Sequence, residues 1–139
     1  MEKIVNRGLK IDLHIHSRFS SKKDGKKVVD NTIENLPVLI ENLEHNNVGM
    51  CAITDHDFFS YDLYKKLKEE ENKDNCIKKV LPGIEFSVEF EPNKEIHIVT
   101  IFDDKDDKKV EKIEEIMTKG IGKERYLEGK FTRRDYFDV

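Results

Sequence analysis

Residues 12–17, Asp-Leu-His-Ile-His-Ser, are the stretch that most constrains the fold and the chemistry of this chain. Side chains alternate along a strand, so Asp12, His14 and His16 point to one face and the apolar residues between them to the other. Histidines at positions i and i+2 stand about 7 Å apart, too far to share one ion unless the strand bends. We expect them to flank one ion or to serve two, and a face of histidine and carboxylate suits zinc, manganese or iron.

Three further short motifs follow, each at or near the end of another strand-like run. They are Thr54-Asp55-His56, Gly83-Ile84-Glu85 and Glu95-Ile96-His97. The alternation of strands and helices favours an α/β fold with mainly parallel strands, in which ligands bind beyond the carboxyl ends of the strands. The four motifs place histidines and a glutamate toward such strand ends, and they therefore predict one shared site.

The hydrophobic pattern predicts the secondary-structure elements around these motifs. Strands are expected at 9–16, 48–54, 77–90 and 95–102, and helices at 30–45, 60–72 and 106–118. Pro37 leaves two alternatives for the first helix, a kink within it or a shorter helix that begins next to the proline. Asn46 and Asn47 suit a left-handed end for that helix. Residues 91–94 form a turn sequence between the last two strands.

Taken in order, the four motifs resemble the PHP family, the polymerase and histidinol phosphatase domains. The family signature is Asp-x-His-x-His-Ser/Thr, then Thr-Asp-His, then Gly-x-Glu, then a histidine on the next strand. This sequence has IDLHIHS at 11–17, AITDHD at 52–57, PGIEFS at 82–87 and EIHIV at 95–99, so the resemblance covers roughly residues 9–103. It implies an irregular TIM-like (β/α)7 barrel, of which this chain would supply a little over half.

A single PHP-like domain is expected over residues 1–139, with a core at 9–118 and a tail at 119–139 in which we expect no closing strand. PHP domains carry two further ligand motifs downstream, yet the sequence after His97 contains no histidine. A barrel of this type needs about 200 residues or more. We therefore expect a chain truncated before those motifs, as part of a longer protein, or else a natural minimal version.

The resemblance also implies roles for individual residues. Two or three divalent transition metals, zinc, manganese or iron, would be held by His14, His16, Asp24, His56, Glu85 and His97. Glu85 would bridge two of the ions, and His56 would serve a third with Asp24, unless Asp24 is a plain turn residue. Asp55 would support the site from behind the ligands, and Asp12 would either do the same or bind metal directly. The catalytic set would be His14, His16, His56 and Glu85.

Glu85 and His97 are also candidates on the basis of their own surroundings. Glu85 follows Gly83, whose missing side chain allows another backbone to approach closely. A carboxylate can bridge two cations, because each of its oxygens can serve one ion. His97 lies among apolar strand residues, where a histidine needs a metal or a polar partner.

Basic residues gather in the loop after the first motif. Arg18 is the expected ligand of a substrate phosphate. Lys22, Lys23, Lys26 and Lys27 crowd the same loop, and such a cluster is expected to form a solvated face. Asp57, directly after the second motif, is a weaker candidate for a role in the site.

The composition argues against several classes of protein. The chain has 39% charged residues and a net charge of −4, so the basic footprint of a nucleic-acid-binding surface is missing. No apolar run approaches the roughly 20 residues of a membrane span. The cysteines, Cys51 and Cys76, form no metal-binding or redox pattern, and no secretion signal is evident. We expect a cytoplasmic protein with no membrane partner.

The function that the resemblance implies is metal-dependent hydrolysis of a phosphate ester, with a nucleotide or a nucleic-acid end among the compatible substrates. Bound cations would neutralise the phosphate oxygens, and one would lower the pKa of a bound water from 15.7 to about 7. The alternative is a non-catalytic PHP module within a larger polymerase- or ATPase-like protein. An incomplete barrel exposes apolar surface, so further domains or a homo-oligomer are expected partners, and the activity of the truncated chain alone stays open.

Overall fold

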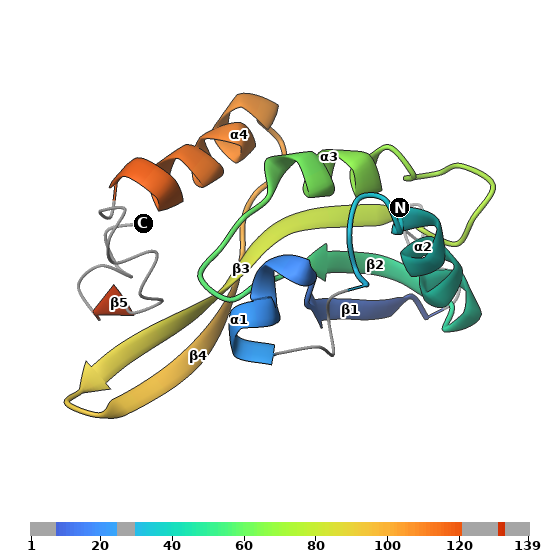
Figure 1. Ribbon diagram of the computed structural model, residues 1–139. Helices are drawn as coiled ribbons and strands as arrows, with labels where there is room; N and C mark the ends of the chain where they lie inside the picture. The colour runs from blue at the N-terminus through green and yellow to red at the C-terminus, as the bar shows by residue number, and fades with distance from the viewer. Residues whose placement is uncertain (1–7, 25–29, 121–130, 133–139) are drawn as a thin grey trace.

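A curled sheet carries the core of the protein in a computed structural model that describes residues 8–24, 30–120 and 131–132. Its strands are β1 (Lys10–Ile15), β2 (Val48–Ile53), β3 (Lys79–Glu91), β4 (Lys94–Ile101) and β5 (Phe131–Thr132). The order is β1-β2-β3-β4, and β5 pairs with β3 (Figure 1). The first three strands run parallel, whereas β4 is antiparallel to β3.

This sheet overturns the expected TIM-like (β/α)7 barrel of PHP type. Such a barrel repeats a strand, a helix and the next parallel strand until the sheet closes on itself. Here β3 passes directly into β4 through a tight turn, in which Asn93 has a left-handed φ of 62°. The turn reverses the chain, so β4 runs antiparallel and the described strands form a curled half-barrel. The fold is therefore a small α/β fold.

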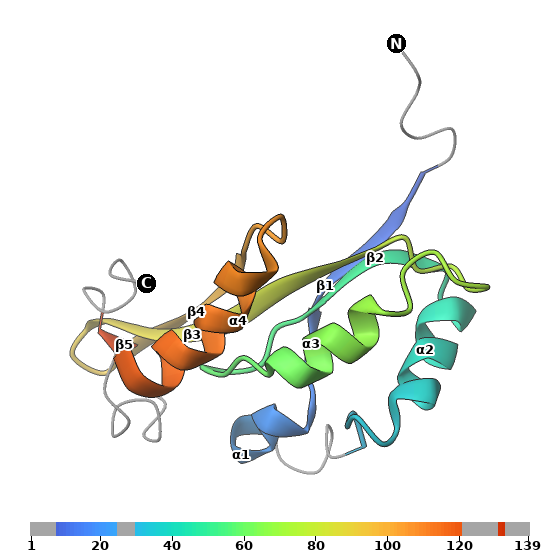
Figure 2. The ribbon, with the colours of Figure 1, turned by 90° about the horizontal axis from the view of Figure 1, so that it is seen from above.

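Helices cover the sheet. They are α1 (Ser21–Asp24), α2 (Leu36–His45), α3 (Tyr61–Lys68) and α4 (Asp107–Glu115), with a 3-10 turn η1 (Arg18–Ser20) before α1 and a π-helical turn η3 (Ile116–Gly120) after α4. Helices α2 and α3 lie on the same side of the sheet, and α4 follows next to α3 (Figure 2). None of the helices in the described part of the chain has the length and apolar character that crossing a bilayer requires.

Most of the expected elements are found, and the first helix shows where the pattern was misleading. The four expected strands lie within two residues of their expected bounds. Helix α2 begins at Leu36 rather than at residue 30, with Pro37 in its first turn, so the shorter alternative is right. Proline suits that position because its missing N–H would have no acceptor within the helix. Asn47 follows the helix with a left-handed φ of 56°.

The tail was expected to carry no closing strand, but two of its residues pair with the sheet. Phe131 and Thr132 run parallel to Val88 and Glu89 of β3. Residues 121–130 and 133–139 of the predicted tail lie outside the described residues.

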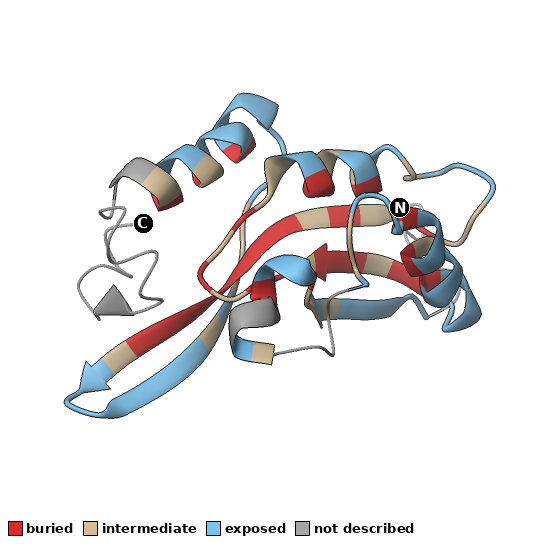
Figure 3. Cartoon of the chain, viewed as in Figure 1, coloured by how far each residue is buried: buried red, intermediate tan, exposed pale blue. Residues whose placement is uncertain are grey.

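The central strand β3 separates an apolar surface from a polar one. Ile84, Phe86 and Val88 are fully buried in the core that the helices complete. Glu85 and Ser87 are also buried. They lie on the opposite face of the strand, because successive side chains of a strand point to opposite faces. Figure 3 shows the buried residues concentrated in β2, β3 and the inner faces of α3 and α4. The buried polar face of β3 is where the candidate site forms.

An ion network ties α3 to the sheet. Asp104, just after β4, accepts hydrogen bonds from Lys68 of α3 (2.8 Å) and from Lys79 at the start of β3. Burial acts to raise the pKa of Asp104, but the hydrogen bonds and charges of the two lysines outweigh it and lower the pKa below the ordinary 3.8. The ionised form of Asp104 therefore stabilises the fold.

We expect Asp104→Asn to lower the free energy of unfolding at pH 7 by about 1–3 kcal/mol, because two partly buried ammonium groups lose their charged acceptor. A lowered folded-state pKa contributes stability above the unfolded pKa, and that contribution is lost as the pH falls through the folded value. The difference between the variant and the wild type should therefore shrink as the pH falls below 3.8. Urea unfolding at several pH values measures it, with exposed Asp103→Asn as the control. A difference that stays constant with pH would contradict this explanation.

Candidate metal centre

Four of the five histidines in the chain meet at the carboxyl ends of β1 and β2, next to the middle of β3 and β4. His14 lies in β1, His16 just after it, His56 after β2, and His97 in β4. Neighbouring rings meet edge to face, with centroids 4.9 Å apart for the first pair, 4.6 Å for the second and 5.0 Å for the third. We call these four residues the histidine row. The fifth histidine, His45, is exposed at the end of α2.

The first two histidines of the row converge more closely than a regular strand allows. The Nε2 atoms of His14 and His16 lie 3.0 Å and 2.7 Å from the same atom, Oε2 of Glu85. The register between β1 and β2 shifts between Asp12 and Ile15, and the strand ends before His16. This irregularity supplies the bend that two histidines at i and i+2 need in order to share one ion.

Glu85 lies at the centre of the row and faces all four imidazoles. Its Oε2 is also 3.4 Å from Nδ1 of His56, and its Oε1 is 3.2 Å from Nδ1 of His97. Burial acts to raise the pKa of Glu85, but hydrogen bonds and positive charge from His14, His56 and His16 outweigh it and lower the pKa. Glu85 is therefore a carboxylate at neutral pH, with its two oxygens directed at different histidines.

Gly83 allows β3 to bring Glu85 this close to the second motif. A Cβ at Gly83 would lie 2.7 Å from Cγ2 of Thr54 and 2.9 Å from Cδ1 of Ile101, too close for either neighbour to stay in place. The backbone oxygen of Thr100 would lie only 3.0 Å from this Cβ, which confirms the expected close approach of another backbone. As a result, the backbone of Glu85 pairs with the residues on both sides of His56, through hydrogen bonds of 3.0 Å and 2.9 Å.

Asp24, at the end of α1, brings a second carboxylate to the row. One of its oxygens binds Nδ1 of His16, and the other lies 3.3 Å from Nε2 of His56. Burial acts to raise the pKa of Asp24, but the hydrogen bonds and charges of His16 and His56 outweigh it and lower the pKa. The structure thus places Asp24 against the same two imidazoles that Glu85 contacts through their other ring nitrogens.

Three overlapping sets of side chains have a composition and spacing that fit a metal ion. The sets are His14, His16 and Glu85; His16, Asp24 and His56; and His56, Glu85 and His97; within each, one ligand atom per residue lies within 4.8 Å of the others. Imidazole nitrogen and carboxylate oxygen together suit zinc, manganese or iron. Nδ1 of His56 is buried and has no hydrogen-bond partner among the described residues. The donors therefore fit the expected cations.

Shared residues limit how many ions the three sets can hold at once. Glu85 can serve two sets because it has two oxygens. A neutral imidazole has one nitrogen with a free lone pair, so His16 and His56 can each serve one ion at a time. The six residues can therefore bind two metal ions, one on each side of Glu85. Alternatively, they can bind three metal ions, with fewer protein ligands for each ion.

Asp55 ties together the two loops that carry the row. Its carboxylate accepts the backbone N–H of Ser17 (2.6 Å), the hydroxyl of Ser17 (2.5 Å) and the hydroxyl of Ser20 (2.7 Å). The Ser20 oxygen in turn accepts the backbone N–H of His56 (2.9 Å). Burial raises the pKa of Asp55 despite these donors. Asp55 thus supports the site through serines and holds His16 next to His56.

Two of the predicted residues lie off the row. Asp12 is exposed, and its Oδ1 accepts the backbone N–H of His14 (3.2 Å). Arg18 is exposed in η1. The pKa of Glu34 is lowered, first by a hydrogen bond from its own backbone and then by one from Thr32. The positive charge of Arg18 also contributes to this lowering. Among the contacts of the described residues, none joins the side chain of Asp12 or Arg18 to an imidazole.

A second polar cluster next to the row escaped the sequence analysis. Lys23, predicted to belong to a solvated face, donates to Oγ of Ser87 and lies 3.3 Å from Oδ2 of Asp57 and 3.5 Å from Oε1 of Glu95. One signal was available: Ser87 stands two residues after Glu85 and so shares its face of the strand. Lys26 and Lys27 lie outside the described residues, and so does the side chain of Lys22.

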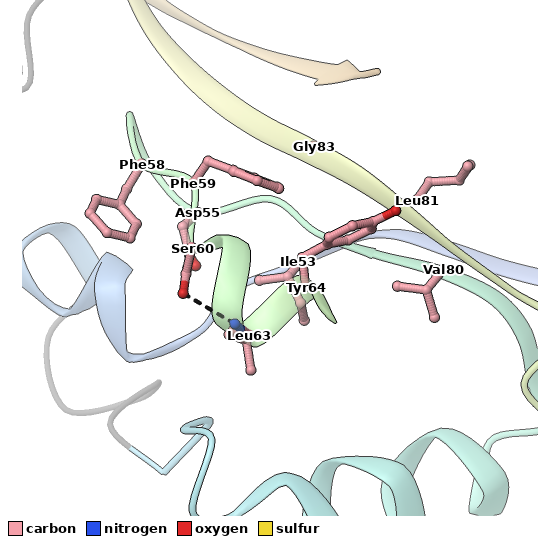
Figure 4. A pocket seen from close by; sticks show the side chains of 10 residues that line it. All are labelled: Ile53, Asp55, Phe58, Phe59, Ser60, Leu63, Tyr64, Val80, Leu81 and Gly83. Atoms are coloured by element: carbon pink, nitrogen blue, oxygen red, sulfur yellow. Dashed lines mark hydrogen bonds between the residues drawn. The ribbon is translucent and has the colours of Figure 1, made fainter. Parts of the chain in front are cut away.

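A small cavity behind the second motif is separate from the row. It lies between β3, the loop after β2 and α3, where Ser60 caps the helix by accepting the N–H of Leu63 at 3.3 Å (Figure 4). Its volume of about 10 Å³ has room for roughly one water. The cavity is therefore too small for a phosphate ester.

The row is instead open to solvent at both of its ends. The side chains of His14 and His97 are 55% and 44% exposed, whereas that of His56, between them, is 6% exposed. The row is thus accessible from solvent at these two residues. No protein-family model matches this chain, and no curated protein matches it.

Proposed function

We propose that the histidine row, with Glu85 and Asp24, binds two or three divalent transition metals and that this centre hydrolyses a phosphate ester. The observation that supports the proposal is Glu85, a buried carboxylate whose two oxygens face four imidazoles. A carboxylate in that position suits a pair of neighbouring cations, the arrangement that many phosphoester hydrolases use. The order of the four sequence motifs, which resembles the PHP family, supports the same chemistry.

The residues of the row and their supports have defined tasks in this proposal. With two ions, His14 and His16 would hold one cation and His56 and His97 the other, with Glu85 between them. Asp24, in contact with His16 and His56, would supply a further carboxylate ligand. When bound, the cations neutralise phosphate oxygens and lower the pKa of water. Asp55 keeps the two ligand-bearing loops together, so that the ligands are oriented before an ion arrives. The open ends of the row leave room for the ester.

A cytoplasmic setting is part of the proposal. Cys51 and Cys76 are both free thiols. Burial raises the pKa of the Cys51 thiol to about 12, so this thiol stays protonated and unreactive at neutral pH. Free thiols of this kind are typical of proteins from reducing compartments.

The protein purified without chelator should contain one or more equivalents of zinc, manganese or iron per chain. Removing the metal should lower the melting temperature by about 5–10 °C. A ligand at 100 times its Kd adds about 2.7 kcal/mol to the folded state, and each kcal/mol shifts Tm by about 2–4 °C for a chain of this size class. Elemental analysis and thermal unfolding with and without EDTA measure the two effects. A folded protein that contains no metal and whose Tm does not change when metal is added would contradict the proposal.

Hydrolysis of p-nitrophenyl phosphate and bis(p-nitrophenyl) phosphate with added Mn²⁺ tests the reaction itself. His56→Gln should lose metal and activity together, because His56 belongs to two of the three sets. His45→Gln changes the one histidine outside the row and should keep both properties. A metal-loaded protein that cleaves neither ester would contradict the phosphoesterase proposal and favour a non-catalytic module.

A further inference from the structure

The cluster of Lys23, Asp57, Ser87 and Glu95 lies beside the histidine row but has no task in the proposed chemistry. We propose that Lys23 is a positioning residue: its contacts with β3, β4 and the loop after β2 hold α1 in place, so that the Asp24 carboxylate meets His16 and His56. This inference rests on the proposed metal centre and concerns only the part of it that depends on Asp24.

Lys23 supplies the positive charge at a buried carboxylate. Oδ1 of Asp57 accepts the backbone N–H of Ser87 (2.6 Å), whereas its buried Oδ2 makes no hydrogen bond among the described residues and faces Nζ of Lys23 at 3.3 Å. A buried charge without a partner is strongly destabilising. The ion pair therefore stabilises the arrangement in which Lys23 contacts Ser87 of β3 and Asp57 of the loop after β2.

Helix α1 depends on contacts with the rest of the protein, because it is not stable by itself. It spans four residues, too few to be stable as an isolated helix. The preceding turn is fixed by Ser20, which binds Asp55 (2.7 Å) and the backbone of His56 (2.9 Å). At the other end, Lys23 is the anchor. Successive residues of a helix point about 100° apart, so Lys23 can reach β3 while Asp24 faces the row.

The contacts of Lys23 argue against a direct role in binding the ester. An ammonium group has three donors and no acceptor. Three acceptors surround this one, since Nζ binds Oγ of Ser87 and lies 3.3 Å from Asp57 and 3.5 Å from Glu95. Lys23 therefore acts through its neighbour Asp24 rather than on a phosphate.

A Co²⁺ titration followed by visible absorption tests this role without measuring catalysis. Asp24→Asn should weaken one equivalent of bound metal, and Lys23→Met should weaken the same equivalent by about 10–100-fold, the loss seen when groups that orient ligands are removed. Lys23→Arg keeps the charge and should restore the affinity. The double variant Lys23→Met/Asp24→Asn should lose no more than Asp24→Asn alone, because the two residues act as a unit.

Two further variants separate positioning from general damage. Lys23→Met leaves the Asp57 carboxylate buried and unpaired, which could destabilise the fold by itself. The double variant Lys23→Met/Asp57→Asn removes both charges, so the protein should still fold. Lys65→Met breaks an exposed ion pair with Asp107 (3.2 Å) and should bind Co²⁺ like the wild type.

The possible outcomes distinguish this inference from the proposed function. Wild-type affinity in both Lys23→Met and Lys23→Met/Asp57→Asn would overturn the role of Lys23 and leave the metal centre standing. Loss of every equivalent in Lys23→Met/Asp57→Asn, rather than of the Asp24-dependent one alone, would also overturn it. A wild-type protein that binds no Co²⁺ would overturn both proposals.

Discussion

Replacing Glu85 by glutamine should lower kcat/KM for the proposed hydrolysis of a phosphate ester by about a thousandfold or more. The carboxylate faces His14, His16, His56 and His97, and it belongs to two of the three candidate metal sets. An amide has one oxygen and no charge, so it cannot serve two cations. Metal ions contribute several kcal/mol of transition-state stabilisation, and a loss of about 4 kcal/mol corresponds to about a thousandfold.

Steady-state kinetics at saturating Mn²⁺, together with the metal content of the variant, measure this effect. Glu89→Gln, four residues further along β3, makes the same chemical change at a side chain that accepts the N–H of Asn93 in the turn (3.2 Å), and it should retain activity. A circular dichroism spectrum like that of the wild type shows that Glu85→Gln is folded. A folded variant with full metal content and full activity would exclude Glu85 from the centre.

Asp55→Ala should have the largest effect on stability, lowering the free energy of unfolding by about 3–5 kcal/mol. The change leaves three buried donors without their acceptor, the N–H and hydroxyl of Ser17 and the hydroxyl of Ser20. Each buried polar group left unsatisfied costs about 1–3 kcal/mol. Asp55→Asn keeps one acceptor oxygen of nearly the same shape and should show an intermediate loss.

Urea unfolding followed by circular dichroism measures this loss. Asp62→Ala is the control, because Asp62 is exposed in the first turn of α3 and its favourable interaction with the helix dipole is worth about 0.3–1 kcal/mol. If Asp55→Ala unfolds within 1 kcal/mol of the wild type, the serine network does not hold the two loops together.

The local elements could be predicted from the sequence where their signals are local. The hydrophobic pattern predicted a strand at 48–54, and β2 occupies Val48–Ile53. Pro37 marked the start of α2 more reliably than the apolar periodicity before it did. Such signals depend on a few adjacent residues, so the rest of the fold does not override them.

The architecture could not be predicted in the same way, because it depends on how strands join over long distances. The turn at Pro92-Asn93 already indicated a hairpin, and a hairpin makes its strands antiparallel. The prediction of a barrel was based on the resemblance of the motifs to a family. Such motifs indicate where the ligands lie but not in which direction each strand runs. The local turn chemistry was therefore the better guide to β4.

The candidate site shows the same division. His16 and His56 meet because they follow the carboxyl ends of the parallel strands β1 and β2, as expected. The expectation of a strand end was wrong for Glu85, which lies in the middle of the long strand β3. Lys23 was missed because a lysine cluster carries no information about which member lies against a buried acid. The contacts of Lys23 with Asp57 and Ser87 depend on the placement of α1, which the pattern of the lysines does not show.

The strands that supply the row have a mechanical consequence for the whole molecule. His14 comes from β1, His56 from the end of β2, Glu85 from β3 and His97 from β4, so the candidate ligands span the sheet from one outer strand to the other. Cations bound there would cross-link the sheet at right angles to its strands, as a disulfide would, but only while metal is present. Separating any one strand would then require release of an ion, so a sheet that lacks the mutual support of a closed barrel would unfold as one unit.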